Sequence, residues 1–266
     1  MDERIPKVSQ PLLLWFRWIA RRNFRREFHT VRVSGLRHLR GLDGPLLVYA
    51  NHSSWWDPLM AFLVSGTLMR TRRHYAPMDA EALTRYKILS LLGVFPVAVS
   101  SARGAVRFLR TGEAILRGGG VLWVTPQGRF ADARERPIVF KPGMAALAAR
   151  IPGCAVLPMA IEYVFWDERT PEALLQFGEP VRVEEGEATE ALEARLVGAL
   201  EAVMAELQVR AMSRDARQFE RVLVRGRVGV GGFYGIGKRA KAILTRTQYQ
   251  AEHGGPGSTV GSVAKE

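Results

Sequence analysis

The stretch that decides the fold covers residues 46–58 and reads Leu46-Leu47-Val48-Tyr49-Ala50-Asn51-His52-Ser53-Ser54-Trp55-Trp56-Asp57-Pro58. Its first five residues are apolar or aromatic, which indicates a buried strand over residues 46–50. Proline favours the first turn of a helix and aspartate favours the N-cap, so we expect a helix to begin at Asp57 and Pro58. His52 then lies in a short loop between the strand and the helix.

This loop brings His52 and Asp57 within reach of each other. On one continuous helix, a spacing of five residues would point the two side chains about 140° apart, so the pair requires a turn at Ser53 and Ser54. Imidazole titrates near neutrality, and a carboxylate on its other nitrogen fixes the tautomer and stabilises the imidazolium. Such a pair is suited to removing a proton from an alcohol. The other interpretation is an ordinary loop histidine followed by a helix cap, and the spacing alone does not choose between them.

The residues around this loop resemble a known family. Residues 51–57 resemble the Asn-His-x4-Asp signature of the lysophospholipid acyltransferase superfamily, which includes the 1-acylglycerol-3-phosphate acyltransferases. Further blocks follow in the order of that family: Gly93-Val94-Phe95-Pro96-Val97, Pro126-Gln127-Gly128, Phe140-Lys141-Pro142-Gly143 and Val156-Leu157-Pro158-Met159. Several weak motifs in the right order are far more specific than any one of them.

The resemblance implies an acyltransferase that moves a fatty acyl group from acyl-CoA or acyl carrier protein to a hydroxyl of a lysophospholipid in glycerolipid synthesis. His52 would be the base and Asp57 would orient it, with no metal or cofactor beyond the thioester co-substrate. Backbone N–H groups of the loop at Gly128 are expected to bind the oxyanion. The residues expected to contact substrates are Asn51, Ser53, Gln127, Gly128, Arg129, Lys141 and Pro158.

The third block departs from the family pattern. Typical members read Pro-Glu-Gly-x-Arg there, whereas this chain has Gln127 in place of the glutamate and Phe130 in place of the arginine. Ala98 and Val99 occupy the region of a second family arginine. Two absent guanidinium groups remove the best bidentate phosphate ligands. A less charged lipid alcohol, such as a glycolipid or a glycosylated carotenoid, is therefore the alternative acceptor. The cations that could compensate are Arg103, Arg129, Arg134 and Lys141.

Strands alternate with helices along the rest of the chain. Short strands are expected at 30–34, 95–99, 121–124, 154–163 and 174–183, the fourth of them interrupted at Pro158. Helices are expected after Pro58, over 83–92, after an N-cap at Ser101, and over 144–150 and 189–212. The basic run 70–74 is expected to be a solvated loop. This alternation predicts an α/β fold, a single domain with a mostly parallel or mixed central sheet covered by helices.

Composition and charge limit the class of protein. A chain of 266 residues with 47% hydrophobic residues supports one large core, and the single cysteine, Cys154, cannot form an internal disulfide. The net charge of +12 is concentrated at the ends: residues 1–40 carry ten Arg and Lys against three Asp and Glu, and residues 210–249 carry ten against two. Basic flanks around a neutral centre predict an anionic membrane surface as partner. No nucleic-acid motif is present, so nucleic acid is not expected.

Residues 11–26 form an apolar stretch followed by arginines. Arg17 interrupts it after six residues, so a bilayer-spanning helix is not expected. A helix here would place Leu12, Trp15, Phe16 and Ile19 on one face and Arg17, Arg21 and Arg25 on another, which predicts an amphipathic helix in the membrane interface. The alternative is a helix packed on the domain's own core. No secretory signal is recognised, so we expect a peripheral or monotopic protein on the cytoplasmic face of the cell membrane.

The expected organisation has four parts: a membrane-associating helix (1–29), an acyltransferase domain (30–212), a basic C-terminal extension (213–251) and a disordered tail (252–266). Residues 232–238 mimic the spacing of a phosphate-binding loop, but Arg239 stands where a Ser or Thr should bind magnesium, so no nucleotide site is expected. Two other function classes stay open, a non-catalytic basic membrane-binding protein and a family member that has lost activity. The sequence does not indicate an oligomeric state.

Overall fold

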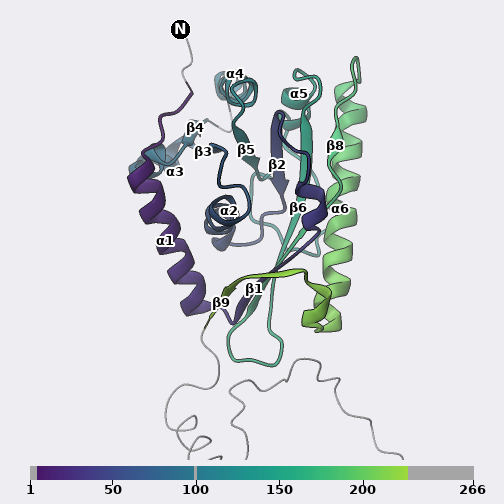
Figure 1. Ribbon diagram of the computed structural model, residues 1–266. Coiled ribbons are helices and arrows are strands. Elements are labelled where there is room, and N and C mark those ends of the chain that lie inside the picture. The colour runs from purple at the N-terminus through teal and green to yellow at the C-terminus, as the bar shows by residue number, and fades with distance from the viewer. Residues whose placement is uncertain (1–4, 99–100, 227–266) are drawn as a thin grey trace, which may run out of the picture.

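The computed structural model describes residues 5–98 and 101–226 (Figure 1). The predicted disordered tail, the 232–238 stretch and most of the predicted basic extension lie outside the described residues.

A mixed β-sheet forms the centre of the protein. Within the described residues nine strands join it, in the order β4-β3-β5-β2-β6-β7-β1-β9, with β8 paired to β6. Their bounds are β1 Thr30–Ser34, β2 Leu46–Ala50, β3 His74–Asp79, β4 Val94–Val97, β5 Val121–Val124, β6 Ala155–Val164, β7 Glu172–Phe177, β8 Val181–Arg182 and β9 Arg221–Arg225.

The strands from β4 to β6 in the sheet order are all parallel, and antiparallel pairs occur only beyond them among the described residues. β2 runs parallel to β5 on one side and to β6 on the other, so the carboxyl ends of these three strands share one edge of the sheet. β7 is antiparallel to β6, β1 is parallel to β7, and β9 is antiparallel to β1. The prediction of a single α/β domain with a mixed sheet is confirmed.

Helices cover both faces of this sheet. α1 (Gln10–Glu27) and α2 (Trp56–Thr67) lie on one face, and α6 (Thr189–Ser213) lies on the other, to the right in Figure 1. α4 (Ala102–Arg117) and α5 (Met144–Ala148) pack on the same face as α6. The remaining helical segments are short: α3 (Ala80–Arg85) and the 3-10 turns η1 (Leu36–Leu39), η2 (Lys87–Leu91) and η3 (Ala216–Gln218).

The position of β2 between two layers of helices explains why its sequence is continuously apolar. Leu46, Val48 and Ala50 pack in the core on the α1 and α2 side, whereas Leu47 and Tyr49 pack in the core on the α4 to α6 side. A strand between two helical layers has no solvent face, so every side chain is apolar. The Tyr49 hydroxyl donates to the Leu196 carbonyl at 2.8 Å, which satisfies its buried polar atom.

Two strands were not predicted. The basic run 70–74 ends in β3, because His74 pairs with Val121 of β5. β9 pairs with β1, so the sheet continues beyond residue 212, where the acyltransferase domain was expected to end. The domain boundary stays a prediction. Neither strand carries the strict alternation that identifies a strand from sequence.

Two predicted elements differ in detail. β6 is continuous through Pro158, which lies opposite Tyr49 of β2 and accepts a hydrogen bond from the Gly178 N–H at 3.0 Å. The helix predicted over 83–92 divides into α3 and η2, because the backbone at Tyr86 leaves the helical region.

α1 packs against the domain with one face. Leu13, Ala20 and Phe24 are buried. Arg17, predicted to lie on an exposed basic face, instead turns inward and donates to the Ser65 hydroxyl of α2 at 3.3 Å. Burial and the charge of Arg70 lower the pKa of Arg17. The predicted faces of this helix are therefore wrong in part.

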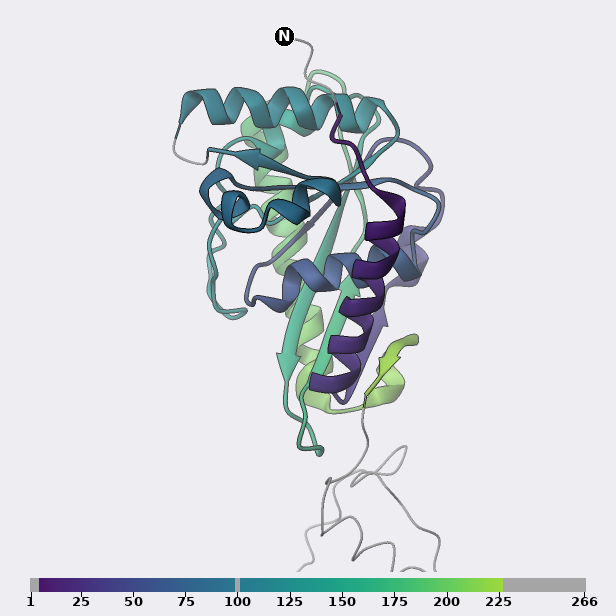
Figure 2. The same cartoon turned by 90° about the vertical axis from the view of Figure 1, so that its left-hand side faces the viewer.

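The other face of α1 is apolar and exposed. Leu14 is 62% exposed, Trp15 52% and Trp18 56%, whereas the predicted face residues Leu12, Phe16 and Ile19 are half-buried. Figure 2 shows α1 at the front of the molecule. Among the described residues, no helix has the length and apolar character needed to cross a bilayer.

Candidate active site

The site lies at the carboxyl edge of the sheet, where β2 ends. Asn51 follows the last residue of β2, and its side-chain amide makes two hydrogen bonds to the backbone of Ile161 in β6, at 2.9 and 2.8 Å. These two bonds fasten the end of β2 to β6 and leave the next residue, His52, outside the sheet. Asn51 is 2% exposed, so it acts on the fold rather than as the predicted substrate contact.

His52 and Asp57 are in direct contact. The imidazole Nδ1 lies 2.8 Å from the Asp57 Oδ2. The same oxygen accepts the backbone N–H groups of Ser53 at 2.8 Å and Ser54 at 2.9 Å, so the turn between them wraps around the carboxylate. The Asp57 side chain is 2% exposed and that of His52 is 18% exposed. The imidazole is therefore the part of the pair that a substrate can reach.

The role predicted for Asp57 at the helix start is corrected. α2 begins at Trp56, with Trp55 at the N-cap position, so Asp57 lies inside the first turn. Its carboxylate accepts N–H groups of the loop before the helix, whereas an N-cap accepts those of the helix itself. A negative charge in the first turn still interacts favourably with the helix dipole.

Tyr163 is a partner that the sequence did not reveal. Its hydroxyl donates to the Asp57 Oδ1 at 2.7 Å from near the end of β6. Burial, followed by the charge of Asp57, raises the pKa of Tyr163 well above its usual value, so it stays a protonated donor. Tyr163 lies 106 residues from Asp57 in the chain. The one signal that points to this contact is that Tyr163 lies near the carboxyl end of β6, which runs parallel to β2.

These contacts assign the tautomer of His52. An ionised carboxylate accepts hydrogen bonds and donates none, so the imidazole Nδ1 carries the proton that faces Asp57. The Nε2 atom then holds a lone pair and is the acceptor for a proton. The pair is arranged as a general base oriented by a carboxylate.

The loop after β5 makes hydrogen bonds to both the backbone N–H and the backbone carbonyl of His52. Gln127 is 6% exposed, and its Oε1 accepts the His52 N–H at 3.0 Å. The Ala131 N–H donates to the His52 carbonyl at 2.8 Å. Gly128 adopts a φ of 60°, a left-handed conformation that favours glycine at this turn. Its own N–H donates to the Thr125 carbonyl at 3.1 Å.

Two of the four cations proposed as phosphate ligands are already in ion pairs. Arg129 donates from both terminal nitrogens to Glu135. Arg134 donates to Asp132 at 2.8 Å, and this hydrogen bond lowers the pKa of Asp132. Within the described part of the chain, Lys141 and Arg103 have exposed side chains that make no ion pair.

Phe130 lies against the imidazole. The centroids of the His52 and Phe130 rings are 4.4 Å apart, and Phe130 is 48% exposed. The sequence indicated only that an arginine was missing here, and the structure shows that an aromatic ring stands in its place beside His52.

The remaining predicted site residues divide into two groups. Ser53 gives its backbone N–H to Asp57, and its buried hydroxyl has no hydrogen-bond partner among the described residues. Pro158 is buried inside the sheet opposite Tyr49, where it packs in the core. The structure thus gathers Ser53, Gln127 and Gly128 around the histidine and aspartate.

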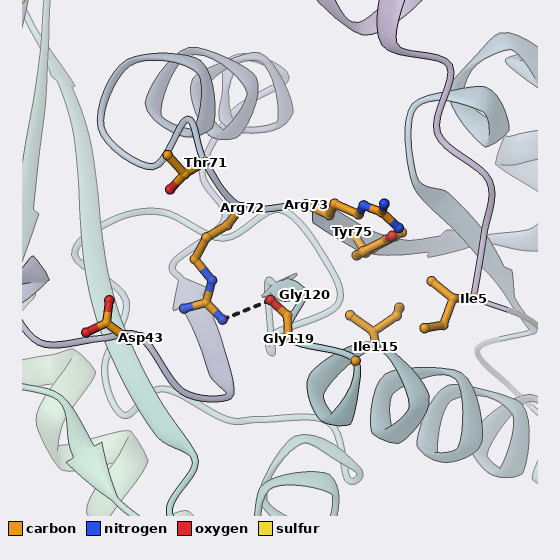
Figure 3. Close-up of a pocket in the computed structure, with 10 residues that line it drawn as sticks. Ile5, Asp43, Thr71, Arg72, Arg73, Tyr75, Ile115, Gly119 and Gly120 are labelled. Carbon is orange, nitrogen blue, oxygen red and sulfur yellow. Dashed lines mark hydrogen bonds between the residues drawn. The ribbon is translucent and has the colours of Figure 1, made fainter.

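A cavity of about 360 Å³ lies elsewhere (Figure 3). It is lined by Asp43, which precedes β2, and by the loop before β3 and the end of α4. This is the amino edge of the parallel strands, opposite the edge that carries His52. In it Arg72 donates to the Leu42, Gly44 and Gly119 carbonyls, so its guanidinium fastens three loops.

Residues 30–162, half of the chain, match a protein family described as Acyltransferase. The chain belongs to this acyltransferase family. The matched region contains β1 to β5, the histidine and aspartate pair and the loop of Gln127. A search of curated proteins finds no significant match.

A solved structure has the same fold. The chain is similar to the 1-acyl-sn-glycerophosphate (LPA) acyltransferase PlsC from Thermotoga maritima, with a TM-score of 0.52 and 23% sequence identity. The alignment covers 74% of this chain and 79% of that one. At 23% identity, this similarity shows that the two proteins share a fold.

Proposed function

We propose that this acyltransferase moves a fatty acyl group from acyl-CoA or acyl carrier protein to a hydroxyl of a lipid acceptor, with His52 as general base. The observation that carries the proposal is the 2.8 Å contact between the imidazole Nδ1 and Asp57, because it leaves the Nε2 atom ready to accept a proton. No metal or other cofactor takes part in this scheme.

The reaction follows from that geometry. The acceptor hydroxyl gives its proton to the His52 Nε2, and its oxygen attacks the thioester carbonyl carbon to form a tetrahedral oxyanion. When this intermediate collapses, the carbon–sulfur bond breaks and the imidazolium returns the proton to the departing thiolate. The products are an ester and a free thiol. General base catalysis of this kind contributes about two to four decades of rate.

Asp57 would stabilise the imidazolium formed during this step. Its carboxylate is held by Tyr163 and by two backbone N–H groups, so it keeps its position when the charge on His52 changes. A preorganised charge needs no rearrangement at the moment of reaction.

The oxyanion needs backbone N–H groups that do not already donate a hydrogen bond within the protein. The Gly128 N–H is committed to Thr125, and the Ala131 N–H is committed to His52. The N–H groups of Arg129 and Phe130 make no backbone hydrogen bond among the described residues. They are the candidates for the oxyanion hole, one or two residues along from the predicted glycine.

The first candidate acceptor is a lysophospholipid of the 1-acylglycerol-3-phosphate type. Family membership and the name of the similar PlsC structure support it. Lys141 and Arg103 would then supply the cations for the phosphate. A second candidate, a less charged lipid alcohol, is supported by Phe130 beside the base and by the ion pair that occupies Arg129.

We also propose that the protein binds an anionic membrane as a peripheral protein, on the cytoplasmic face of the cell membrane. The exposed ridge of Leu14, Trp15 and Trp18 on α1 supports this, because tryptophan favours the headgroup boundary. The guanidinium of Arg22 lies 5.5 Å from the Trp18 ring, so a cation accompanies the ridge. Each basic residue near such a surface contributes on the order of 1 kcal/mol.

The test is acceptor-dependent thiol release by the purified full-length protein. Acyl-CoA and acyl carrier protein are each offered with lysophosphatidate and with neutral lipid alcohols. Thiol release that rises with acceptor and yields the acylated lipid supports the proposal. A protein that binds vesicles or retains DNA at moderate salt, yet releases no thiol with any acceptor, is the non-catalytic binding protein instead.

A further inference from the structure

A row of aromatic side chains leads outward from the base. Phe130 lies 4.4 Å from the His52 ring, Trp55 lies 6.1 Å from Phe130, and Tyr86 lies 6.2 Å from Trp55, all between ring centroids. We call Phe130, Trp55 and Tyr86 the aromatic row. Its members come from the loop after β5, the loop after β2 and the junction of α3 with η2, so the fold gathers them from distant parts of the sequence.

The aromatic row is exposed. Phe130 is 48% exposed, Trp55 64% and Tyr86 46%, although large aromatic side chains are normally placed where most of their surface is covered. Contiguous exposed apolar surface beside a reactive group marks a ligand surface more often than a structural one. The row begins at the imidazole, so whatever covers it also meets the base.

The two arginines in the loop that carries Phe130 are not free to hold a phosphate. Arg129 and Arg134, which flank this part of the loop, are both held by neighbouring carboxylates. Gln127 is neutral. A phosphate placed over Phe130 would lose its hydration to an aromatic ring without gaining a guanidinium in exchange, which is unfavourable.

A sugar ring fits this surface. Tyr86 and Trp55 combine an apolar ring with a polar hydroxyl or N–H group, and neither polar group has a partner among the described residues. A sugar likewise presents an apolar C–H face and hydroxyl edges. The reacting hydroxyl has to approach the His52 Nε2 to about 3 Å, and the ring of Phe130 is beside that imidazole. A group that brings its hydroxyl to His52 is therefore close to Phe130.

We propose that the acceptor is an uncharged glycolipid and that the aromatic row binds its sugar head group, whose hydroxyl is acylated. This inference rests on the proposed function and names the acceptor of the same site. In the step, the sugar O–H proton passes to His52, the sugar oxygen forms the ester bond, and the donor leaves as a thiol that takes the proton back.

The experiment compares a monoglucosyl lipid with lysophosphatidate of the same acyl chain, using the full chain and acyl-CoA. For the wild type we expect kcat/KM for the glucosyl lipid to exceed that for lysophosphatidate by about tenfold or more. Phe130→Ala and Trp55→Ala should each raise the KM for the glucosyl lipid by about tenfold. Acceptor-independent thioester hydrolysis, measured for each variant, reports separately on the histidine and aspartate pair.

Two further variants sharpen the comparison. Phe130→Arg restores the arginine of the family pattern and should move the preference toward lysophosphatidate. Phe165→Ala is the matched control, because Phe165 is 68% exposed and lies outside the aromatic row, and it should leave both acceptors unaffected.

A wild type that prefers lysophosphatidate would overturn the inference while leaving the proposed function intact. Equal losses for both acceptors in Phe130→Ala would overturn it as well, because the ring would then serve the site generally. No transfer to any lipid alcohol would overturn the proposed function, and the inference with it.

Discussion

At the scale of single residues, the buried carboxylate of Asp57 explains how a solvent-accessible histidine is kept in one orientation. Four donors converge on it: the His52 imidazole, the backbone N–H groups of Ser53 and Ser54, and the Tyr163 hydroxyl. Asp57→Asn preserves this geometry, because the amide oxygen can accept the same three N–H groups while its NH2 donates to the tyrosine. The charge is lost, so we expect transfer to fall by about ten- to a hundredfold, less than on removing the histidine.

The measurement is kcat for transfer, with a urea unfolding curve for each protein. Loss of a carboxylate from the first turn of α2 should reduce the free energy of unfolding by about 1 kcal/mol. Wild-type kcat in a correctly folded Asp57→Asn variant would mean that the carboxylate has no part in the chemistry.

Tyr163→Phe removes one hydrogen bond to a buried carboxylate. Such a bond contributes about 1.5–3 kcal/mol, so the unfolding free energy should fall by that amount and kcat should fall several-fold, with the acceptor KM unchanged. Tyr75→Phe is the control, because Tyr75 is a buried tyrosine whose hydroxyl has no hydrogen bond among the described residues. Equal effects of the two changes would show that the Tyr163 hydroxyl does not act through Asp57.

At the scale of elements, the loop after β5 positions His52 through Gln127. Gln127→Ala leaves a nearly buried backbone N–H without its acceptor, which destabilises by about 1–3 kcal/mol, and it should lower kcat about tenfold without changing the donor KM. Gln127→Glu keeps an accepting oxygen in that place and should retain most of the activity. If the glutamate variant is as impaired as the alanine variant, the hydrogen bond is not what matters.

α1 is an element with two faces, and only one of them is proposed to meet the membrane. The double variant Trp15→Ser and Trp18→Ser removes the exposed tryptophans and should weaken co-sedimentation with anionic vesicles at least tenfold, since each buried aromatic contributes about 1.5–3 kcal/mol. Phe165→Ser is the exposed aromatic control. Unchanged sedimentation of the double variant would place the membrane contact elsewhere. Deleting the helix is a poorer test, because Phe24 belongs to the core.

The sequence predicted the elements whose pattern is local. The strand at 46–50, the helix after it and the N-cap at Ser101 of α4 all follow from neighbouring residues, and the structure has each of them. The contacts of Tyr163 and Gln127 depend instead on which strand ends lie side by side, and sequence spacing carries no information on that. The inward turn of Arg17 was missed for the same reason, since a helical pattern does not show what packs against it.

At the scale of the whole molecule, stability should depend on pH through His74. Its Nε2 faces the Met69 carbonyl at 2.8 Å and its Nδ1 accepts the Trp123 N–H at 3.0 Å, so the neutral ring fits this place. Burial lowers the pKa of His74 to about 4, with smaller contributions from Arg17 and Arg72. The unfolded chain binds a proton near pH 6.5 that the folded protein does not, so stability is complete above that pH and falls as the pH approaches 4.

The expected loss across this window is about 3 kcal/mol. Urea unfolding between pH 7 and pH 4.5 measures it, and His74→Phe, which cannot titrate, should flatten the slope even though it lowers stability at every pH. An identical slope in the variant would assign the pH dependence to other groups.

The measurement that bears most directly on the central claim is transfer of a labelled acyl chain from a thioester to a lipid hydroxyl, by wild type and His52→Ala side by side. His52 lies in a loop and is partly exposed, but its imidazole donates to the buried Asp57 carboxylate, so the variant should fold and should unfold at a lower urea concentration than the wild type. We predict that it transfers two to four decades more slowly, about the contribution of a general base. Transfer at the wild-type rate by the folded His52→Ala protein would contradict the account.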